Sequence, residues 1–309
     1  MSGAFSGFPV HEVVEGKLFY VSVPPKRLPN GTLVLAPLPS DTSADAYYAM
    51  EEFCVYYPFF LDFGPVALNR VYRFCQRLGD LLARRGRVTL VSGAHMQRRA
   101  NSVFLLGAHG VLYRGLSPAA ALAPFKGMSP ALAPWHDASP QADPFHLSTL
   151  DVLRGLERAQ ACGFFSFKSF DLARFEHYEQ VENGDMNWLA DGRFLALAGP
   201  QCPQPGALPE EEGYNATTVE QLLPIFRELG ITSIVRLNRK YYNEKKFTAA
   251  GVVHLDLYFE DGSNPPEALL QKFLRFCEAT PGAIAVRECC HVLHAAPFPI
   301  FAHSAPLFF

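Results

Sequence analysis

The chain has 309 residues, a length that predicts two domains at about 150 residues each. Hydrophobic residues make up 49% of it and charged residues 18%. This composition excludes an intrinsically disordered protein, whose low hydrophobicity and high charge prevent burial. The net charge of -3 and the pI near 6.4 argue against a nucleic-acid partner, which is bound through an excess of basic residues.

Cysteine usage and the chain ends indicate a compartment. The seven Cys are odd in number and form no Cys-x-x-Cys pair, which favours a reducing compartment over a disulfide framework or a zinc ribbon. The N-terminus lacks the charged start and apolar run of a secretory signal. Residues 289–309 are uncharged and long enough to cross a bilayer as a helix, but their three Pro and three His make a poor span. We therefore expect no membrane span.

In the first half, the predicted elements follow one another as in an α/β domain. Apolar residues spaced three and four apart over 66–82 predict an amphipathic helix. The β-branched run 87–91 predicts a buried strand, 92–99 a polar loop and 100–113 an apolar helix. The Ala- and Pro-rich stretch 119–144 predicts a loose surface excursion.

The second half repeats this alternation of helices and strands. The predicted elements are a helix at 217–229, a strand at 233–237, a short turn at 246–250, a strand at 252–258, a helix at 266–278 and a strand at 283–286. Each half therefore predicts an α/β domain with a parallel or mostly parallel sheet, covered on its faces.

A shift of charge marks a boundary near residue 166. Residues 1–165 carry 15 Lys and Arg against 12 Asp and Glu, whereas residues 166–309 carry 12 against 18. The stretch 164–188 is aromatic and acidic, and we interpret it as a short helical linker with one acidic face.

Several runs of sequence carry a resemblance to a known family. In the second half they are EHYEQVENGDMNW at 176–188, FLA at 194–196, VRLN at 235–238, FTAAG at 247–251 and FEDGSNP at 259–265. In the first half they are DFGP at 62–65, VYR at 71–73, QRRAN at 97–101 and FLLGA at 104–108. Over about residues 50–286 the chain resembles the cell division cycle fourteen phosphatases, which are dual-specificity phosphatases of mitotic exit.

The resemblance implies an α/β fold of two tandem dual-specificity-phosphatase-like domains. Residues 1–165 would form a non-catalytic domain, 166–190 an acidic linker helix and 191–309 the catalytic domain. It also implies phosphoprotein partners with phosphoserine-proline and a basic residue downstream, no cofactor, and a location in the nucleus and cytoplasm, including the centrosome or spindle.

The catalytic loop of the family is missing from this sequence. Such enzymes use a Cys thiolate at the end of a central strand and an Arg six positions later that clamps the phosphate. After the strand 283–286 the family continues with His, Cys, five residues and Arg, whereas this chain reads RECCHVLHAA at 287–296. Glu288 stands at the place of the nucleophile and would repel a phosphate dianion. We therefore expect a second domain truncated after its central strand, with a divergent tail at 287–309 that reflects a splice variant or a faulty gene model.

Asp261 matches the general acid of the family, which would protonate the leaving oxygen of a Ser, Thr or Tyr side chain. An Asp-Gly turn ahead of a helix explains the same residue without any chemistry. The resemblance favours the acid.

Four acidic residues, Glu176, Glu179, Glu182 and Asp185, match a linker that in the family selects the basic residue of the substrate. An ordinary solvated helix face has the same spacing. Both interpretations stay open, since they can hold for different members of the four.

Two further clusters are weaker candidates. Arg98 and Arg99 lie at the place of a phosphate loop in the first domain, but residues 92–97 contain no Cys, and surface solvation explains both Arg. Cys289 and Cys290 with His291 and His294 lack the spacing of common zinc sites, so we expect no metal; a palmitoylated Cys pair has no better support.

The sequence leaves three hypotheses about function. The first is a dual-specificity phosphatase homologue that is inactive in this form. The second is a non-catalytic module that binds phosphoproteins or another partner. The third is an unstable fragment, because the apolar strands of the second domain would lack helices on one face and expose large side chains, each costing about 1.5 to 3 kcal/mol.

Overall fold

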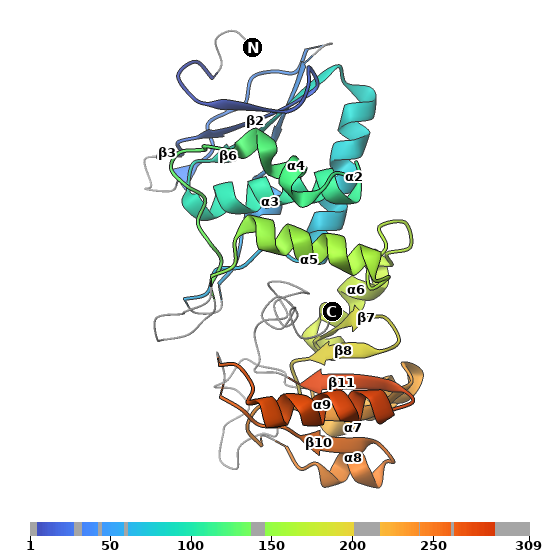
Figure 1. Cartoon of the computed structure of the whole chain (residues 1–309). Helices are drawn as coiled ribbons and strands as arrows, with labels where there is room; N and C mark the ends of the chain where they lie inside the picture. Colours follow the sequence, from blue (N-terminus) through green and yellow to red (C-terminus); the bar gives the residue numbers. More distant parts are fainter. Residues whose placement is uncertain are drawn as a thin grey trace. The chain divides into compact units, whose positions relative to one another are not determined.

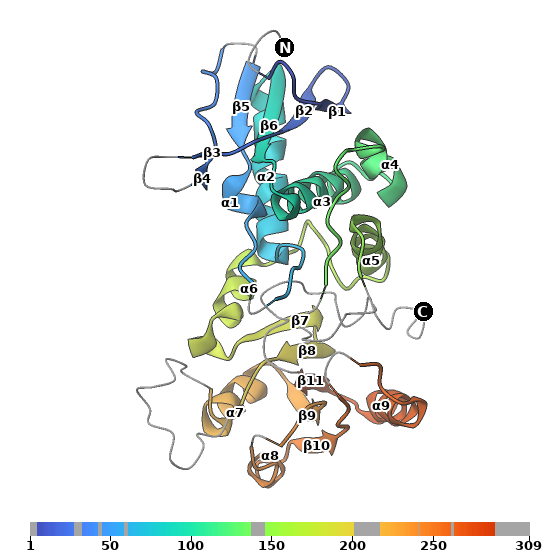
Figure 2. The ribbon, with the colours of Figure 1, turned by 90° about the vertical axis from the view of Figure 1, so that its left-hand side faces the viewer.

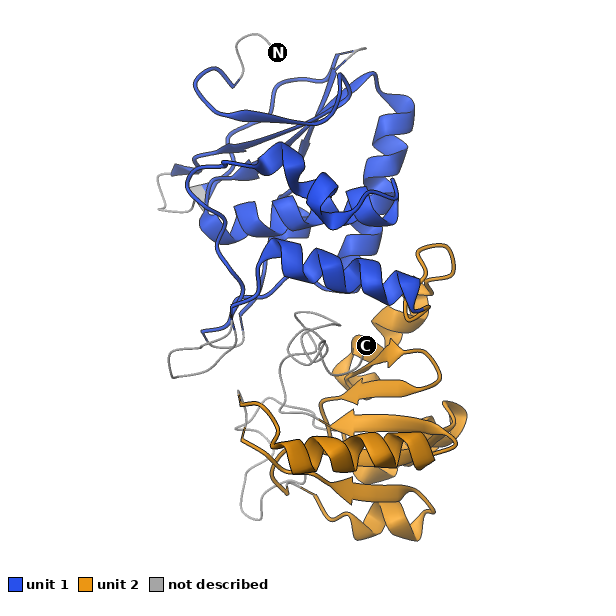
Figure 3. Cartoon of the chain, viewed as in Figure 1, with its two compact units in different colours: residues 1–162, 300–309 blue, residues 163–299 orange. Residues whose placement is uncertain are grey.

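The computed structural model describes residues 5–27, 33–42, 45–58, 61–136, 146–200, 217–240, 242–260 and 263–287. The chain divides into two compact units (Figure 3). The described part of the first ends at Cys162, and the second begins at Gly163. Among the described residues, none of the helices combines the length and the apolar character that a bilayer crossing requires.

The first unit is a four-stranded sheet with helices (Figure 1). Its elements are β1 (Val10–Val14), β2 (Leu18–Val23), β3 (Lys26–Arg27), β4 (Leu33–Val34), β5 (Asp45–Ala49), α1 (Glu51–Cys54), α2 (Leu68–Arg84), β6 (Arg87–Gly93), α3 (Met96–Leu112), α4 (Pro118–Leu122), η1 (Ala123–Phe125) and α5 (Thr149–Ala161). The sheet order is β1-β2-β6-β5. Strands β2 and β5 both run parallel to β6, so their carboxyl ends share one edge.

Helix α3 is the central helix of the first unit. It packs against α1, α2, α4 and α5, and its residues from Arg99 to Val111 are buried. Such all-round burial explains why its apolar run has little one-sided periodicity.

The second unit is a five-stranded sheet between helices (Figure 2). Its elements are α6 (Leu172–Glu179), η2 (Val181–Asn183), β7 (Met186–Ala190), β8 (Phe194–Leu197), α7 (Val219–Glu228), β9 (Ile231–Arg236), α8 (Lys245–Ala249), β10 (Val253–Asp256), α9 (Glu267–Ala279) and β11 (Ala283–Arg287). The order is β10-β9-β11-β8-β7. Only the edge strand β7 is antiparallel to its neighbour.

Both faces of the second sheet carry an apolar core. Ile234 and Ala285 pack with Phe226 of α7 and Phe247 of α8. On the other face, residues that alternate with these along the strands pack against α9; they are Val235, Ile284 and Val286. The expectation of an uncovered face is therefore wrong for the described residues, because α9 supplies the cover.

The main α/β elements of the sequence analysis are confirmed, with displaced ends. Helix α3 begins at Met96, four residues before the expected start, because its polar first turn was interpreted as a loop. The expected helical linker is too long: α6 ends at Glu179, and Met186–Ala190 is the strand β7. The stretch 119–144 is not wholly a surface excursion, because it contains α4 and η1 and because Trp135 is buried against Phe104.

Candidate functional site

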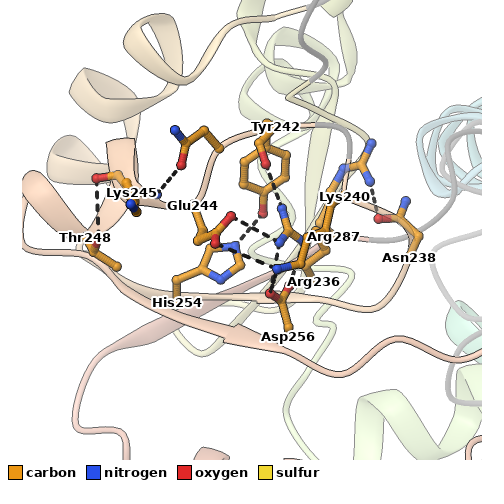
Figure 4. A network of polar contacts seen from close by, with 11 residues as sticks. Arg236, Asn238, Lys240, Tyr242, Glu244, Lys245, Thr248, His254, Asp256 and Arg287 are labelled. Carbon is orange, nitrogen blue, oxygen red and sulfur yellow. Dashed lines mark hydrogen bonds and ion pairs between the residues drawn. The ribbon is translucent and has the colours of Figure 1, made fainter.

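Three neighbouring parallel strands of the second unit end on charged residues. Arg236 ends β9, Asp256 ends β10 and Arg287 ends β11. The carboxyl ends of parallel strands share one edge of a sheet, which is where ligands bind in open α/β sheets. Figure 4 shows these side chains gathered in one polar network. This network is the candidate functional site.

Arg236 is the centre of the network and is fully buried. Its Nε and Nη2 donate to the two carboxylate oxygens of Asp256 at 2.6 and 2.9 Å, and its Nη1 donates to the carbonyl oxygen of Tyr242 at 2.9 Å. Glu244 lies 3.5 Å from Nη2. The bidentate geometry fixes β9 to β10 and leaves the guanidinium fully engaged within the protein.

Tyr242 connects the strands through its ring and its hydroxyl. The Arg236 guanidinium carbon lies 4.6 Å from the ring centroid, and that of Arg287 lies 5.8 Å away. The hydroxyl is 2.8 Å from Nε2 of His254. Stacking of two cations on one ring adds to the stability of this edge.

Arg287 is the last described residue before the place of the catalytic loop. It is fully buried, and its Nη1 donates to the side-chain oxygen of Asn238. Its carbonyl oxygen accepts from the backbone N–H of Leu237 at 3.1 Å. The end of β11, after which the family's catalytic loop would begin, is therefore hydrogen-bonded to the residues that follow β9.

The charges of the network shift its pKa values. Burial would raise the pKa of Asp256, but the hydrogen bonds and charge of Arg236 outweigh it and hold that pKa below its usual range. Burial, aided by the charge of Arg236, lowers the pKa of His254. Burial raises the pKa of Tyr242 to about 12. The site therefore holds an ionised Asp256 and a neutral Tyr242 at neutral pH.

The predicted general acid, Asp261, lies outside the described residues. The backbone N–H of Ser263, after Asp261, donates to the carbonyl oxygen of Glu260, before it, at 3.1 Å. The backbone N–H of Phe259 donates to the carbonyl oxygen of Leu237 at 3.2 Å. The segment before Asp261 is thus held at the end of β9, on the same edge as the polar network. Its role as an acid stays a prediction.

The predicted acidic face does not lie on one helix. Glu176 and Glu179 share a face of α6, three residues apart. Glu182 is exposed in η2, and Asp185 follows with a left-handed φ of 49°. Substrate selection by these four residues stays a prediction.

The other predicted clusters have different outcomes. Cys289, Cys290, His291 and His294 lie outside the described residues. In the first unit, Arg98 is not a solvated surface residue alone, because its Nη1 donates to the carboxylate of Glu51.

The comparisons with known proteins agree with this architecture. Residues 12–159 match the family model described as the N-terminal half of dual specificity protein phosphatases. Mouse dual specificity protein phosphatase CDC14A is 41% identical over 253 residues, which are 80% of this chain and 41% of that protein. Mouse CDC14B is 37% identical over 257 residues, 82% of this chain and 52% of its own.

The chain is a homologue of the CDC14 dual-specificity phosphatases. A third relative agrees: the tyrosine-protein phosphatase cdc-14 of Caenorhabditis elegans is 38% identical over 241 residues, 75% of this chain and 33% of that protein. The sequence resemblance to the CDC14 family and the mixed α/β, phosphatase-like fold are thus confirmed. The chain spans about half the length of these relatives or less.

The sequence analysis missed the network around Arg236. A signal was present: Arg236 and Asp256 lie near the ends of the predicted strands 233–237 and 252–258, and Arg287 follows the predicted strand 283–286. Parallel strand ends share one edge, but the contact of Arg236 with Asp256 also requires that β10 lies next to β9, which the sequence does not specify.

Proposed function

We propose that this CDC14 homologue binds phosphorylated protein segments without hydrolysing them. The cell-cycle role, the phosphoserine-proline substrates and the nuclear and cytoplasmic location belong to this proposal. It also includes two tandem phosphatase-like domains, of which the second would have carried the chemistry.

One observation supports the loss of hydrolysis. Strand β11 runs to Arg287 at the centre of the second sheet, and the sequence after it has no Cys followed by Arg six positions later. Counting six from Cys289 and Cys290 gives Ala295 and Ala296. A thiolate at either Cys would lack the guanidinium that stabilises the transferring phosphoryl group.

Binding is supported by the residues that remain. Glu176 and Glu179 lie three residues apart on α6, and their negative charge suits a basic residue of a peptide. Arg236, by contrast, is fully buried and engaged by Asp256. Phosphate recognition by this chain therefore needs cations other than Arg236.

Turnover of p-nitrophenyl phosphate by the purified chain tests the loss of hydrolysis. We expect no rate above buffer, and the same result for a variant with Cys289→Ser and Cys290→Ser. A rate that disappears in the double variant would contradict the proposal.

Fluorescence polarisation with a phosphoserine-proline peptide that carries a downstream Lys tests the binding. We expect saturable binding that weakens several-fold in a Glu176→Gln, Glu179→Gln double variant. The matched control is Glu157→Gln in α5 of the first unit. No binding by folded protein would refute this part.

A further inference from the structure

A carboxylate from α1 is held beside the loop between β6 and α3 in the first unit. The Gly93 backbone N–H donates to Oε1 of Glu51 at 2.7 Å, and Arg98 donates to Oε2. One oxygen is thus held by the main chain and the other by a guanidinium. Backbone N–H groups and a guanidinium at the start of a helix are the groups that proteins use to bind phosphate.

The sheet register brings Glu51 to this place. Strands β5 and β6 are parallel, and Ala49 is paired with Val91. Glu51 lies two residues beyond Ala49, and Gly93 lies two residues beyond Val91. Because parallel strands end on the same edge, α1 and α3 both begin beside this loop (Figure 2). The carboxylate therefore comes from a different element, 42 residues before the glycine that binds it.

Close approach at Gly93 is part of the arrangement. A Cβ at this position would lie 3.4 Å from Arg98 Nη1 and 3.4 Å from Glu51 Oε1. The Arg98 guanidinium and the Glu51 carboxylate thus pack directly against the Gly93 main chain. No side chain caps α3 at His95, so the partial positive charge of this 17-residue helix also favours an anion.

A second cation lies in the same turn. Arg99 follows Gly93 by six positions, the separation of Cys and Arg in the loop that the second domain lacks. Its side chain is 2% exposed; Nη2 donates to the Pro130 carbonyl oxygen at 2.7 Å, whereas Nη1 has no hydrogen-bond partner among the described residues. A buried donor without a partner costs free energy that an added acceptor would restore.

The residue before Gly93 is fixed by a buried contact with β2. The Tyr20 hydroxyl and the Ser92 hydroxyl are buried and 2.8 Å apart. Burial raises the pKa of Tyr20 to about 12, although its hydrogen bond with Ser92 and the positive charge of Arg99 lower it. Tyr20 therefore stays neutral and holds Ser92, the residue before Gly93, in place.

We propose that the β6–α3 loop is an oxyanion-binding site whose internal ligand is the Glu51 carboxylate, and that it binds free phosphate when this carboxylate is removed. Glu51 acts as an internal competitor, present at a high effective concentration because it is part of the same chain. The intact protein therefore binds phosphate weakly here, although the donors are in place.

Phosphate binding by the Glu51→Ala full-length chain tests this proposal. We expect saturable binding of inorganic phosphate, measured by calorimetry at constant ionic strength, that is at least tenfold tighter than in the unsubstituted chain. The second substitution Arg98→Ala should abolish the gain. Glu52→Ala is the matched control, because it removes the same charge one position later, where the carboxylate contacts the Tyr48 hydroxyl instead.

Three results would overturn the proposal. The first is a folded Glu51→Ala chain that binds phosphate no better than the unsubstituted chain. The second is an equal gain in Glu52→Ala, and the third is a gain that persists without Arg98. Should Glu51→Ala fail to fold, Glu51→Gln keeps the side-chain volume and removes the charge, and it must still bind phosphate more tightly than the unsubstituted chain. Hydrolysis by the second unit affects none of these results.

Discussion

The two units place the same pair of groups at equivalent edges of their sheets. In the first unit, Glu51 follows β5 and meets Arg98 of α3 beside the end of β6. In the second unit, Asp256 ends β10 and meets Arg236 at the end of β9. Each pair joins neighbouring parallel strands at their carboxyl ends.

The surroundings of the two pairs differ. Arg236 is fully buried, and Asp256 and the Tyr242 carbonyl engage its donors. The side chains of Arg98 and Glu51 are 35% and 24% exposed, and one carboxylate oxygen is held by the Gly93 main chain. We infer that the pair of Arg236 and Asp256 is structural. In the other pair, the Glu51 carboxylate occupies a binding site in which another anion can replace it.

Removal of Asp256 is the strongest test of the structural pair. Asp256→Ala leaves Arg236 buried without its bidentate partner, and we expect a loss of roughly 3 to 4 kcal/mol in the free energy of unfolding of the second unit. This value lies in the lower half of the range because the Asp256 side chain is 36% exposed. Hydrogen exchange of the β9 and β10 amides measures it.

Glu244→Ala is the matched control for Asp256→Ala. Its carboxylate lies 3.5 Å from the same guanidinium and is similarly exposed, but it makes no bidentate contact. We expect a cost of at most about 1 kcal/mol. Equal costs for the two variants would contradict the structural role of Asp256.

A buried histidine in the first unit and a half-buried one in the second have different surroundings. His109 of α3 is 2% exposed, stacks on Tyr113 at 5.2 Å, and has no partner for Nε2 among the described residues. In the second unit, Nε2 of His254 contacts the Tyr242 hydroxyl. Burial, with a small contribution from Arg114, lowers the pKa of His109 to about 4.

The first unit should therefore lose stability in weak acid. The pKa of His109 is lower in the folded state than the usual value of about 6.5, so its contribution is complete above pH 6.5 and is lost as the pH falls towards 4. The loss amounts to about 3 kcal/mol. Urea unfolding at pH 7 and pH 4.5 measures it, and His109→Phe should remove this part of the slope.

The exposed His146 provides the control for this pH effect. His146→Phe makes the same change on the surface and should leave the slope as it is. A slope that is unchanged in His109→Phe would show that other groups cause the acid sensitivity.

The elements that sequence predicts well are those with a local signal. The three-and-four spacing of Val71, Phe74, Cys75 and Leu78 gives one buried face to α2. The β-branched run at 87–91 is typical of a buried strand and predicts β6. The start of α3 was missed, because Gln97 and Arg98 in its first turn resemble a polar loop. Strand β7 was missed because the preceding acidic helix extended the expected pattern.

The polar networks could not be predicted in the same way. Glu51 and Gly93 meet because β5 and β6 pair in a particular register, and a shift of one residue would send the carboxylate to the other face. Arg236 and Asp256 look like ordinary charges at the ends of strands. Their contact depends on β10 lying next to β9, which no local pattern specifies.

The resemblance predicted the family, but it also led to a wrong expectation. Missing helices of the family suggested an uncovered face on the second sheet. The residues of α9, among them Phe273 and Cys277, pack on that face instead. Helix α9, which precedes β11, covers this face without the helices that follow the catalytic loop in the family.

Phosphate rescue of stability compares the two edges in one measurement. Glu51→Ala should cost the first unit about 1 to 2 kcal/mol, since a hydrogen-bonded charge is lost. A free anion at ten times its dissociation constant restores about 1.4 kcal/mol. Hydrogen exchange, with phosphate and with chloride at equal ionic strength, should show recovery at β6 in Glu51→Ala and none at β9 in Asp256→Ala. Recovery in both variants, or in neither, would contradict the distinction between a replaceable and a structural carboxylate.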